Sequence, residues 1–354
     1  MKEFTKEHSL MVKGVAIMLL LVYHLFHEQE VLTQMQVNYA PFSEEAFLRF
    51  AGFGNICVAV FVMLTAYGIS KMVFSYAEAD IKEIYAKSLK RFGKLMLNFS
   101  IVYVTINCIC FPYLNYASLY GEGKQGILMM LCDATGLSAV LKTPMLNATW
   151  WYMKIAYVLI FLIPLLALLV KKVGNTALLM AFLAPFVISF DSDIERYFFV
   201  AAFGVCMAYG KWTEKIMSLK IHSVFWWIGG ILGAVLCVLI RQNALVKDWF
   251  WNYVDAFIAF FIILVTVMTI GKVPALNKIL MFLGKHSMNI FLVHTFFYMI
   301  VWRKYIYYFK YAVVTFLILL GVSLVYSVVL EFVKKIIWKF LKFLKKKVKR
   351  TKVF

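Results

Sequence analysis

Long apolar segments, separated by short polar ones, recur along the whole chain. A run of about 18 apolar residues or more can cross a bilayer as a helix. Ten segments are predicted to do so, at residues 10–26, 53–73, 95–113, 148–170, 175–190, 196–210, 223–240, 254–271, 287–302 and 311–333. The alternating segments of about ten residues that form transmembrane β-barrels are absent. We therefore expect an all-α polytopic membrane protein, with a further amphipathic stretch at 127–141 in the interface or the outer leaflet.

Composition supports this class. The 354 residues are 63% hydrophobic and 16% charged, and the mean hydropathy is +0.82, whereas a soluble domain is roughly half apolar. Five of the six cysteines fall in apolar segments, and no Cys/His spacing is typical of a metal site. The first apolar run lacks a small-residue cleavage site and is expected to remain as the first span. No soluble domain, nucleotide-binding loop or internal repeat is visible.

The charges predict the orientation. With the N-terminus in the cytoplasm, 27 of the 37 lysines and arginines fall on the cytoplasmic side, as the positive-inside rule requires. Ten spans then make the C-terminus cytoplasmic too. Residues 334–354 alternate basic with apolar residues, which predicts an amphipathic helix on an anionic leaflet; a nucleic-acid-binding arm is the weaker alternative. We divide the chain into a transmembrane domain at 1–333 and this tail.

Two histidines lie deep in predicted spans, where ionisable groups are costly and often functional. His24 follows Lys13 by about 16 Å of helix, and His294 lies about 10 Å beyond Ser287. A neutral imidazole at such a depth can accept a proton from a hydroxyl group. A structural histidine bonded to a neighbouring helix is the alternative in both cases. The remaining four histidines are expected near span ends, and His286 in particular at a helix start.

A basic cluster, KSLKRFGK, precedes the third predicted span. It contains two pairs of residues one helical turn apart, Lys90 with Lys94 and Lys87 with Arg91. Such a cluster suits a phosphate-rich cytosolic ligand. The alternative is ordinary positive-inside anchoring.

An aromatic block, NATWWYMKIAY, opens the fourth predicted span. Trp150, Trp151 and Tyr152 are typical of an interfacial aromatic belt, but they precede Lys154, which needs a partner or water at that depth. Aromatic faces with one cation also suit a sugar or an acyl chain.

Arg196, after the acidic turn DSDIE, is either interfacial or directed into the same cavity as the aromatic block. Asp255 is a possible partner for Lys154 or Arg196. The spacing of these residues does not decide between the alternatives.

Taken together, six segments resemble the acyltransferase-3 family of integral-membrane O-acyltransferases, in the family's order and over most of the chain. Lys13 and His24 match a basic residue and a histidine with ten residues between them. The other matching segments are VAVFVMLTAYGISK, KRFGK, TWWYMKIAY, RYFFVAAFGV and GKHSMNIFLVH. The chain departs from the family pattern by having lysine for arginine at four positions, and Thr-Ala for Ser-Gly in the second span; the lysines are Lys13, Lys90, Lys94 and Lys154.

The resemblance implies transfer of an acyl group, usually acetyl from acetyl-CoA, to a carbohydrate hydroxyl at the surface of a bacterial plasma membrane. His24 would then be the general base or a nucleophile that carries the acyl group. His294 would orient His24 or assist the leaving thiolate. Coenzyme A would meet the basic residues Lys13, Lys87, Lys90, Arg91 and Lys94. The acceptor, a polysaccharide or lipid-linked glycan, would meet Trp150, Trp151, Tyr152, Lys154 and Arg196.

The expected partners are thus acyl-CoA, a carbohydrate acceptor and membrane lipids, with no metal and no nucleic acid. A transporter or flippase for a glycan or metabolite is the main alternative, because intramembrane His, Lys and Asp also suit a proton relay. The chain shows no paired hydropathy halves of the kind that inverted repeats produce. A non-catalytic sensor on the same scaffold is the second alternative. The sequence does not determine the acceptor sugar, the acyl length or the oligomeric state.

Overall fold

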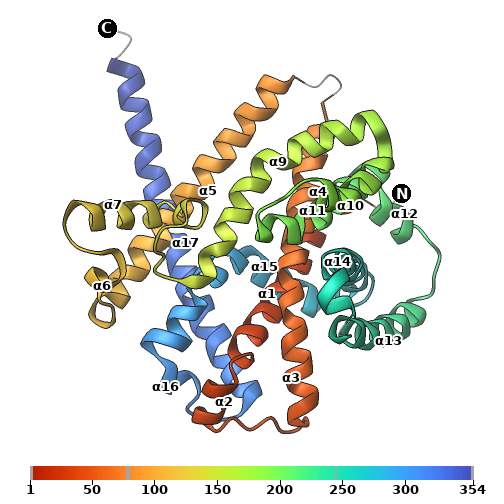
Figure 1. The fold of residues 1–354 in the computed structure, drawn as a ribbon, viewed down its shortest axis with the longest axis horizontal. Helices are drawn as coiled ribbons and strands as arrows, with labels where there is room; N and C mark the ends of the chain where they lie inside the picture. Colours follow the sequence, from red (N-terminus) through yellow and green to blue (C-terminus); the bar gives the residue numbers. More distant parts are fainter. Residues whose placement is uncertain (1–2, 77–79, 244, 352–354) are drawn as a thin grey trace.

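The computed structural model describes residues 3–76, 80–243 and 245–351. The chain is 86% helical, and the described residues form no strand beyond an isolated bridge between Asn38 and Tyr311. Figure 1 shows the helices as one bundle, with the N-terminal half of α5 (Ile81–Cys110) and the C-terminal end of α17 (Ala312–Thr351) extending from the same side. The all-α membrane class is confirmed.

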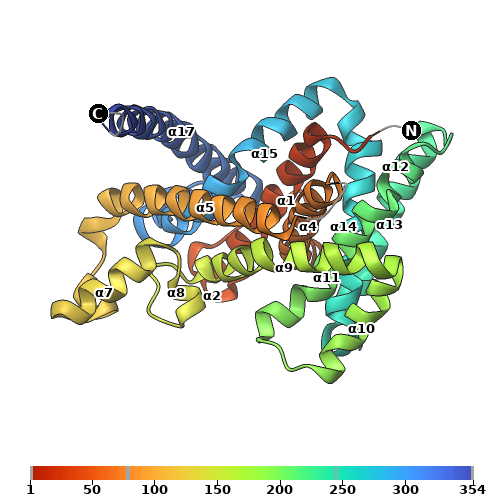
Figure 2. The ribbon, with the colours of Figure 1, turned by 90° about the horizontal axis from the view of Figure 1, so that it is seen from above.

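The centre of the bundle is a close crossing of α1 (Lys6–Phe26) and α15 (Pro274–Thr295) (Figures 1 and 2). A Cβ on Gly14 would lie 2.3 Å from the Leu280 carbonyl oxygen, and one on Gly284 would lie 1.8 Å from that of Leu10. Glycine at both contacts therefore allows the two backbones to touch, as small residues do where membrane helices pack. This crossing fixes the positions of Lys13 and His24 relative to His294.

α4 (Cys57–Phe74) and α14 (Trp251–Met268) pack against α1, and α9 (Tyr152–Val173) and α11 (Ser192–Gly210) pack against α4. A glycine also allows close backbone contact between α4 and α11, where a Cβ on Gly204 would lie 2.8 Å from the Met63 carbonyl oxygen. In Figure 2, α5 and α9 run side by side along one flank of the bundle.

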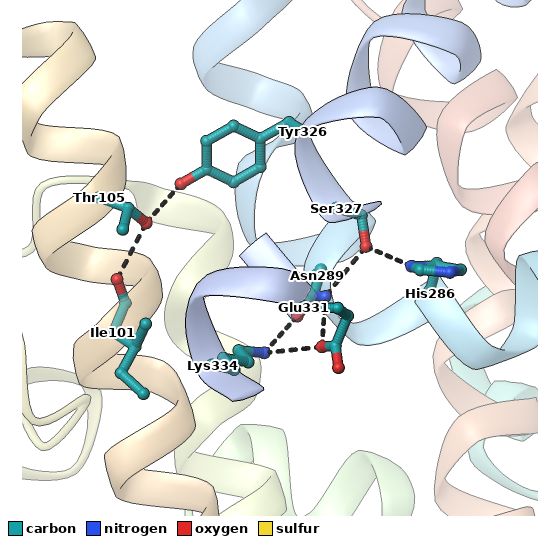
Figure 3. Close-up of polar contacts among 8 residues, drawn as sticks. All are labelled: Ile101, Thr105, His286, Asn289, Tyr326, Ser327, Glu331 and Lys334. Atoms are coloured by element: carbon teal, nitrogen blue, oxygen red, sulfur yellow. Dashed lines mark hydrogen bonds and ion pairs between the residues drawn. The ribbon is translucent and has the colours of Figure 1, made fainter. Parts of the chain in front are cut away.

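A polar network joins α15 to α17 (Figure 3). The Asn289 amide donates to Ser327 Oγ and to Glu331 Oε1, at 2.9 Å each, and Lys334 Nζ donates to Asn289 Oδ1 at 2.7 Å. His286 Nδ1 lies 2.8 Å from Ser327 Oγ. His286 is buried in the middle of α15, so the prediction that it lies at a helix start is wrong. The network pins α15 from the side opposite α1.

The remaining helices are shorter or peripheral. They are α2 (Gln29–Met35), α3 (Glu44–Phe53), α6 (Tyr116–Tyr120), α7 (Gly123–Ala134), α8 (Ser138–Leu141), α10 (Ala177–Val187), α12 (Trp212–Met217), α13 (Ser223–Gln242) and α16 (Arg303–Ile306). Turns of 3-10 helix span Gly54–Ile56, Phe111–Tyr113, Ala148–Trp151, Gly174–Thr176 and Ile270–Lys272, and π-helical turns span Val246–Phe250 and Phe296–Val301.

Seven helical stretches in the described residues are long and apolar enough to cross a membrane: Lys6–Phe26, Glu44–Phe74, Ile81–Tyr113, Ala148–Val187, Ser223–Gln242, Trp251–Lys272 and Ala312–Phe340. The predicted count of ten is therefore not reproduced. The span predicted at 175–190 is α10, whose 11 residues extend about 16 Å, half of a hydrocarbon core. The span predicted at 287–302 begins earlier, because α15 starts at Pro274. No helix break separates the tail from 311–333, since α17 continues to Thr351; residues 352–354 lie outside the described chain.

The stretch at 127–141 forms α7 and α8, with Ile127, Leu128 and Leu131 exposed. On the opposite face of α7, Asp133 is 1% exposed and accepts hydrogen bonds from the Tyr120 hydroxyl at 2.6 Å and the Leu146 amide at 2.7 Å. The helix α7 thus has an exposed apolar face and a buried polar anchor on the opposite face.

Asp133 makes the stability of this segment depend on pH. Burial raises the pKa of its carboxyl group to about 6 from 3.8, although its two hydrogen bonds lower it. The folded state therefore binds the proton more tightly than the unfolded state, so stability falls as the pH rises from about 4 to about 6. We expect the melting temperature of the wild type to fall across this window relative to that of Asp133→Asn. Parallel pH profiles for the two proteins would contradict this assignment.

Candidate active site

A cavity of about 330 Å³ opens among α1, α4, α5, α9 and α15; we call it the cation cavity. Three cations line it, Lys13 from α1 and Arg91 and Lys94 from α5. None of the three forms an ion pair with any residue that the structure describes. The rest of the wall is mostly apolar, and its residues are Leu20, Val58, Phe61, Thr65, Leu95, Asn98, Tyr152, Ala156, Ile160, Ser287, Met288 and Phe291.

The helical repeat decides which basic residues of α5 reach this cavity. Arg91, Lys94 and Asn98 are spaced by three and four residues, so they share one face. Lys87 continues the same stripe but lies beyond the cavity, where its Nζ contacts Glu83 at 2.9 Å and the Tyr76 ring at 4.4 Å. Lys90, Arg91 and Lys94 are all exposed, but Lys90 is not part of the cavity wall. Of the four predicted residues on α5, the structure thus places two against the cavity. Arg91, not Lys90, lines it together with Lys94.

A second cavity, of about 350 Å³, lies at the other end of α1; we call it the histidine cavity. Its wall mixes polar side chains with aromatic rings and apolar side chains. The lining residues are His24, His27, Glu28, Leu146, Asn147, Ala148, Thr149, Trp151, Thr295, Tyr298, Met299 and Ile300. The Asn147 amide donates to the Thr295 hydroxyl, which ties the loop before α9 to the end of α15.

His24 and His294 face each other between the two cavities. Their ring centroids are 4.9 Å apart, and His294 is fully buried. His294 Nδ1 lies 2.8 Å from the Phe291 carbonyl oxygen and 3.2 Å from that of Ile290. Because carbonyl oxygens only accept, Nδ1 carries the hydrogen, and His294 Nε2 is left as a lone-pair acceptor. This Nε2 has no hydrogen-bond partner among the described residues.

The aromatic block is divided among three environments. Trp150 is a packing residue: it is 1% exposed, contacts Phe99 and Phe296, and donates through Nε1 to the Leu292 carbonyl at 2.9 Å. Trp151 lines the histidine cavity, and Tyr152 lines the cation cavity. The junction of the 3-10 turn with α9 thus places two consecutive side chains in different cavities.

The two other predicted cations line neither cavity. Lys154 Nζ lies 2.8 Å from Asp191 and 2.5 Å from Asp193, so the acidic turn supplies its partners. The Arg196 guanidinium lies 4.1 Å from the Trp251 ring centroid, and its Nε and Nη2 are buried without a partner among the described residues. It stays close to the site through Tyr197, whose ring stacks on Trp151.

The prediction that Asp255 partners Lys154 or Arg196 is wrong. Asp255 forms a bidentate pair with Arg241 of α13, at 2.7 and 3.0 Å, and accepts from Trp251 Nε1 at 2.6 Å. Both members of the pair are buried. Because α13 exposes an apolar face over most of its length, this pair and Gly230 are its main points of attachment. Arg241 is the basic residue in the last turn of an apolar helix. This position is the only feature of the sequence that could have marked it as a partner for Asp255.

Several residues at the site were missed from the sequence. Asn98 was detectable, because it extends the stripe of Arg91 and Lys94. Thr295 and Tyr298 follow His294 at one and four residues, but only the helical continuation beyond residue 295 directs them into the histidine cavity. Phe291 and Leu20 carried no signal, since apolar residues in apolar spans are ordinary.

Fold and site together define a multi-pass helical membrane protein with two facing histidines between the cation cavity and the histidine cavity. Residues 11–332 match the model of the acyltransferase-3 family, described as an acyltransferase domain. The chain therefore belongs to this family and is a membrane acyltransferase. No curated protein and no solved structure matches it significantly.

Proposed function

We propose that this protein transfers an acyl group, acetyl in the first instance, from cytosolic acyl-CoA to a carbohydrate hydroxyl on the other side of a bacterial plasma membrane. The observation that carries the proposal is the position of His24 and His294 between the two cavities. The family supplies the reaction class, and the lining of each cavity supports the assignment of its ligand.

The cation cavity suits the donor. Coenzyme A is an anion with several phosphates at one end and a thioester at the other, and Lys13, Arg91 and Lys94 offer three positive charges without competing carboxylates. From Lys13 to His24 is about 16 Å of helix, comparable to the reach of an extended pantetheine arm. Phosphates held at the cations would therefore bring the thioester close to the histidines. Lys87 and Lys90 would act at longer range, at the cavity entrance.

The histidine cavity suits the acceptor. Its Thr149 and Glu28 side chains offer hydrogen-bond partners for sugar hydroxyls, and Trp151 offers an aromatic face. The Asn147 side chain orients Thr149 and Thr295. Trp150, Lys154 and Arg196 would support this cavity from behind, Arg196 through the Tyr197 ring that stacks on Trp151. A polysaccharide or a lipid-linked glycan fits this arrangement.

Two routes balance atoms and charge. In the direct route, one imidazole removes the hydroxyl proton, the oxygen attacks the thioester carbonyl, the C–S bond breaks, and the imidazolium protonates the departing thiolate. In the two-step route, an imidazole nitrogen attacks the thioester carbonyl, the C–S bond breaks, and the ring proton passes to the thiolate, which leaves an acyl-imidazole and free CoA. The hydroxyl oxygen then takes the acyl group, the C–N bond breaks, and the hydroxyl proton returns to the imidazole. The lone pair on His294 Nε2 serves either route, by accepting a proton from His24 or from the substrate.

The test is the fate of labelled acetyl groups. Membranes containing the protein are incubated with acetyl-CoA labelled in the acetyl group, and glycan, protein and free acetate are separated. Label on glycan supports transfer, and label on the protein that glycan then removes supports the two-step route. Uptake of a glycan without movement of label would favour a transporter and contradict the proposal.

Arg91→Gln and Lys90→Gln test whether the donor binds in the cation cavity. The sequence predicts both residues as CoA ligands, whereas the structure places only Arg91 in the cavity wall. Both remove one charge from the same turns of α5. Loss of a hydrogen bond to a charged group costs about 1.5–3 kcal/mol, so we expect Arg91→Gln to raise the KM for acetyl-CoA about tenfold or more with little change in kcat. Lys90→Gln should change KM by about twofold at most, because Lys90 does not line the cation cavity. Equal effects would place the donor outside the cation cavity.

A further inference from the structure

The two cavities end within about one helical turn of each other. On α1, Leu20 lines the cation cavity, and His24, four residues later, lines the histidine cavity. On α15, Phe291 and Thr295 are divided in the same way. Four residues of α-helix correspond to about 6 Å. The wall between the cavities is therefore one layer of side chains thick.

Leu20, Tyr152 and Phe291 form the side of this wall that faces the donor; we call them the partition. The Phe291 ring packs edge-on against Tyr152, with centroids 5.4 Å apart and an interplanar angle of 74°. It also lies 6.3 Å from the His294 ring. Leu20 is 1% exposed and Phe291 7% exposed. The end of the cation cavity nearest the histidines is thus closed by packed apolar groups.

The Phe291 ring has little freedom to withdraw. Its helix contacts α1 backbone to backbone at Gly284, and the network of Asn289, Glu331 and Lys334 pins it to α17 on the other side (Figure 3). A helix held on two faces cannot shift to enlarge the cavity without breaking one of these contacts.

This geometry, taken with the proposed function on which the inference rests, limits the acyl group. With the phosphates at Lys13, Arg91 and Lys94, the thioester carbonyl reaches the histidines only when the acyl carbons lie against the partition. Each added methylene must find room beside Phe291. A phenyl ring is larger than a two-carbon extension of an acyl chain, so its removal would make that room.

We propose that Phe291 determines the length of the acyl group that this enzyme accepts, admitting acetyl and excluding butyryl and longer chains. Phe291 touches the acyl group and performs no chemistry. Discrimination by a hydrophobic pocket is about 10–200-fold per methylene, so we expect Phe291→Ala to raise the affinity for butyryl-CoA relative to acetyl-CoA about tenfold or more.

The experiment uses the full chain in lipid nanodiscs. Unlabelled acetyl-, butyryl- and hexanoyl-CoA compete with radiolabelled acetyl-CoA for binding, so no acceptor is needed. Met288→Ala is the matched control: Met288 lines the same cavity from the same helix, nearly one turn farther from the histidines. Phe291→Leu provides a smaller change in case the alanine variant folds poorly, and it should shift the preference in the same direction to a smaller extent.

A raised preference for butyryl-CoA in the Phe291 variants, with Met288→Ala unchanged, is the expected result. An unchanged preference in both Phe291 variants would overturn the inference, and so would an equal shift in Met288→Ala, because total cavity volume would then set the length. Transfer to glycan, measured separately in membranes, tests the proposed function. A changed binding preference without any transfer would overturn that function and leave the partition as the determinant of acyl length.

Discussion

Replacing His24 by alanine is expected to lower acetyl transfer to glycan by about 10²–10⁴-fold, the usual contribution of a general base. Of the facing pair, His24 lines the histidine cavity, whereas His294, with its ring centroid 4.9 Å away, is fully buried. The binding of acetyl-CoA should change little, because the substitution leaves untouched Lys13, Arg91 and Lys94, which we propose hold the phosphates. Initial rates of label transfer and competition binding on the same membranes measure the two effects.

His222→Ala is the control for this substitution. His222 caps the start of α13 and lies outside both cavities, so transfer should stay within about twofold of the wild type. Acidification should reproduce the His24 defect in the wild type, since a protonated imidazole has no lone pair for a proton or an acyl group. Full transfer by His24→Ala would falsify the assignment of the site.

Replacing Gly284 by alanine should prevent the chain from folding correctly. The added Cβ would lie 1.8 Å from the Leu10 carbonyl oxygen, a backbone atom that cannot rotate away. Relief requires α1 and α15 to separate, which removes the contact that sets His24 against His294. Overpacking costs about 1–3 kcal/mol where side chains can adjust, and we expect a greater loss here. Size-exclusion profiles and melting temperatures of the detergent-solubilised protein measure it.

Gly321→Ala is the matched control for Gly284→Ala. Gly321 lies in a membrane helix, α17, but a Cβ there meets no atom within 4 Å. Because alanine favours helix over glycine by about 1 kcal/mol, this variant should be at least as stable as the wild type. If the two substitutions behaved alike, the close crossing of α1 and α15 would not be the contact that organises the bundle.

The sequence predicted which chemistry is present better than it predicted where each group lies. Lys13, His24 and His294 were detectable because ionisable residues stand out in apolar segments. Lys90 and Arg91 are adjacent in the sequence, but only Arg91 lines the cavity, because one helical step rotates a side chain by about 100°. Likewise, Trp150 and Trp151 are adjacent residues of the same type in different environments. Trp150 is packed in the core, and Trp151 faces the histidine cavity.

Span boundaries were hardest where the polypeptide departs from one helix per apolar run. The apolar composition of α10 marked it as a span, but its length is about half of what a bilayer needs. The polar start of α15 falls outside the predicted spans, because Lys278 and Lys285 interrupt its apolar pattern. It is helical because Gly284 lets it pack on α1, and helix stability inside a bundle comes from such packing more than from local composition.

The sequence by itself determined that this is a helical membrane protein of the acyltransferase-3 family with ionisable groups inside its spans. A charged group within a membrane span is costly wherever it occurs. An ionisable residue in an apolar segment is therefore recognisable from the sequence alone. Only the tertiary structure decided which of those groups meet. Asp255 pairs with Arg241, Lys154 with Asp191, and His24 with His294, in each case across helices whose mutual approach depends on small residues and side-chain packing. Contacts between residues far apart in the chain produce no periodic pattern in the sequence. For this reason the partition at Phe291 could be identified only from the tertiary structure.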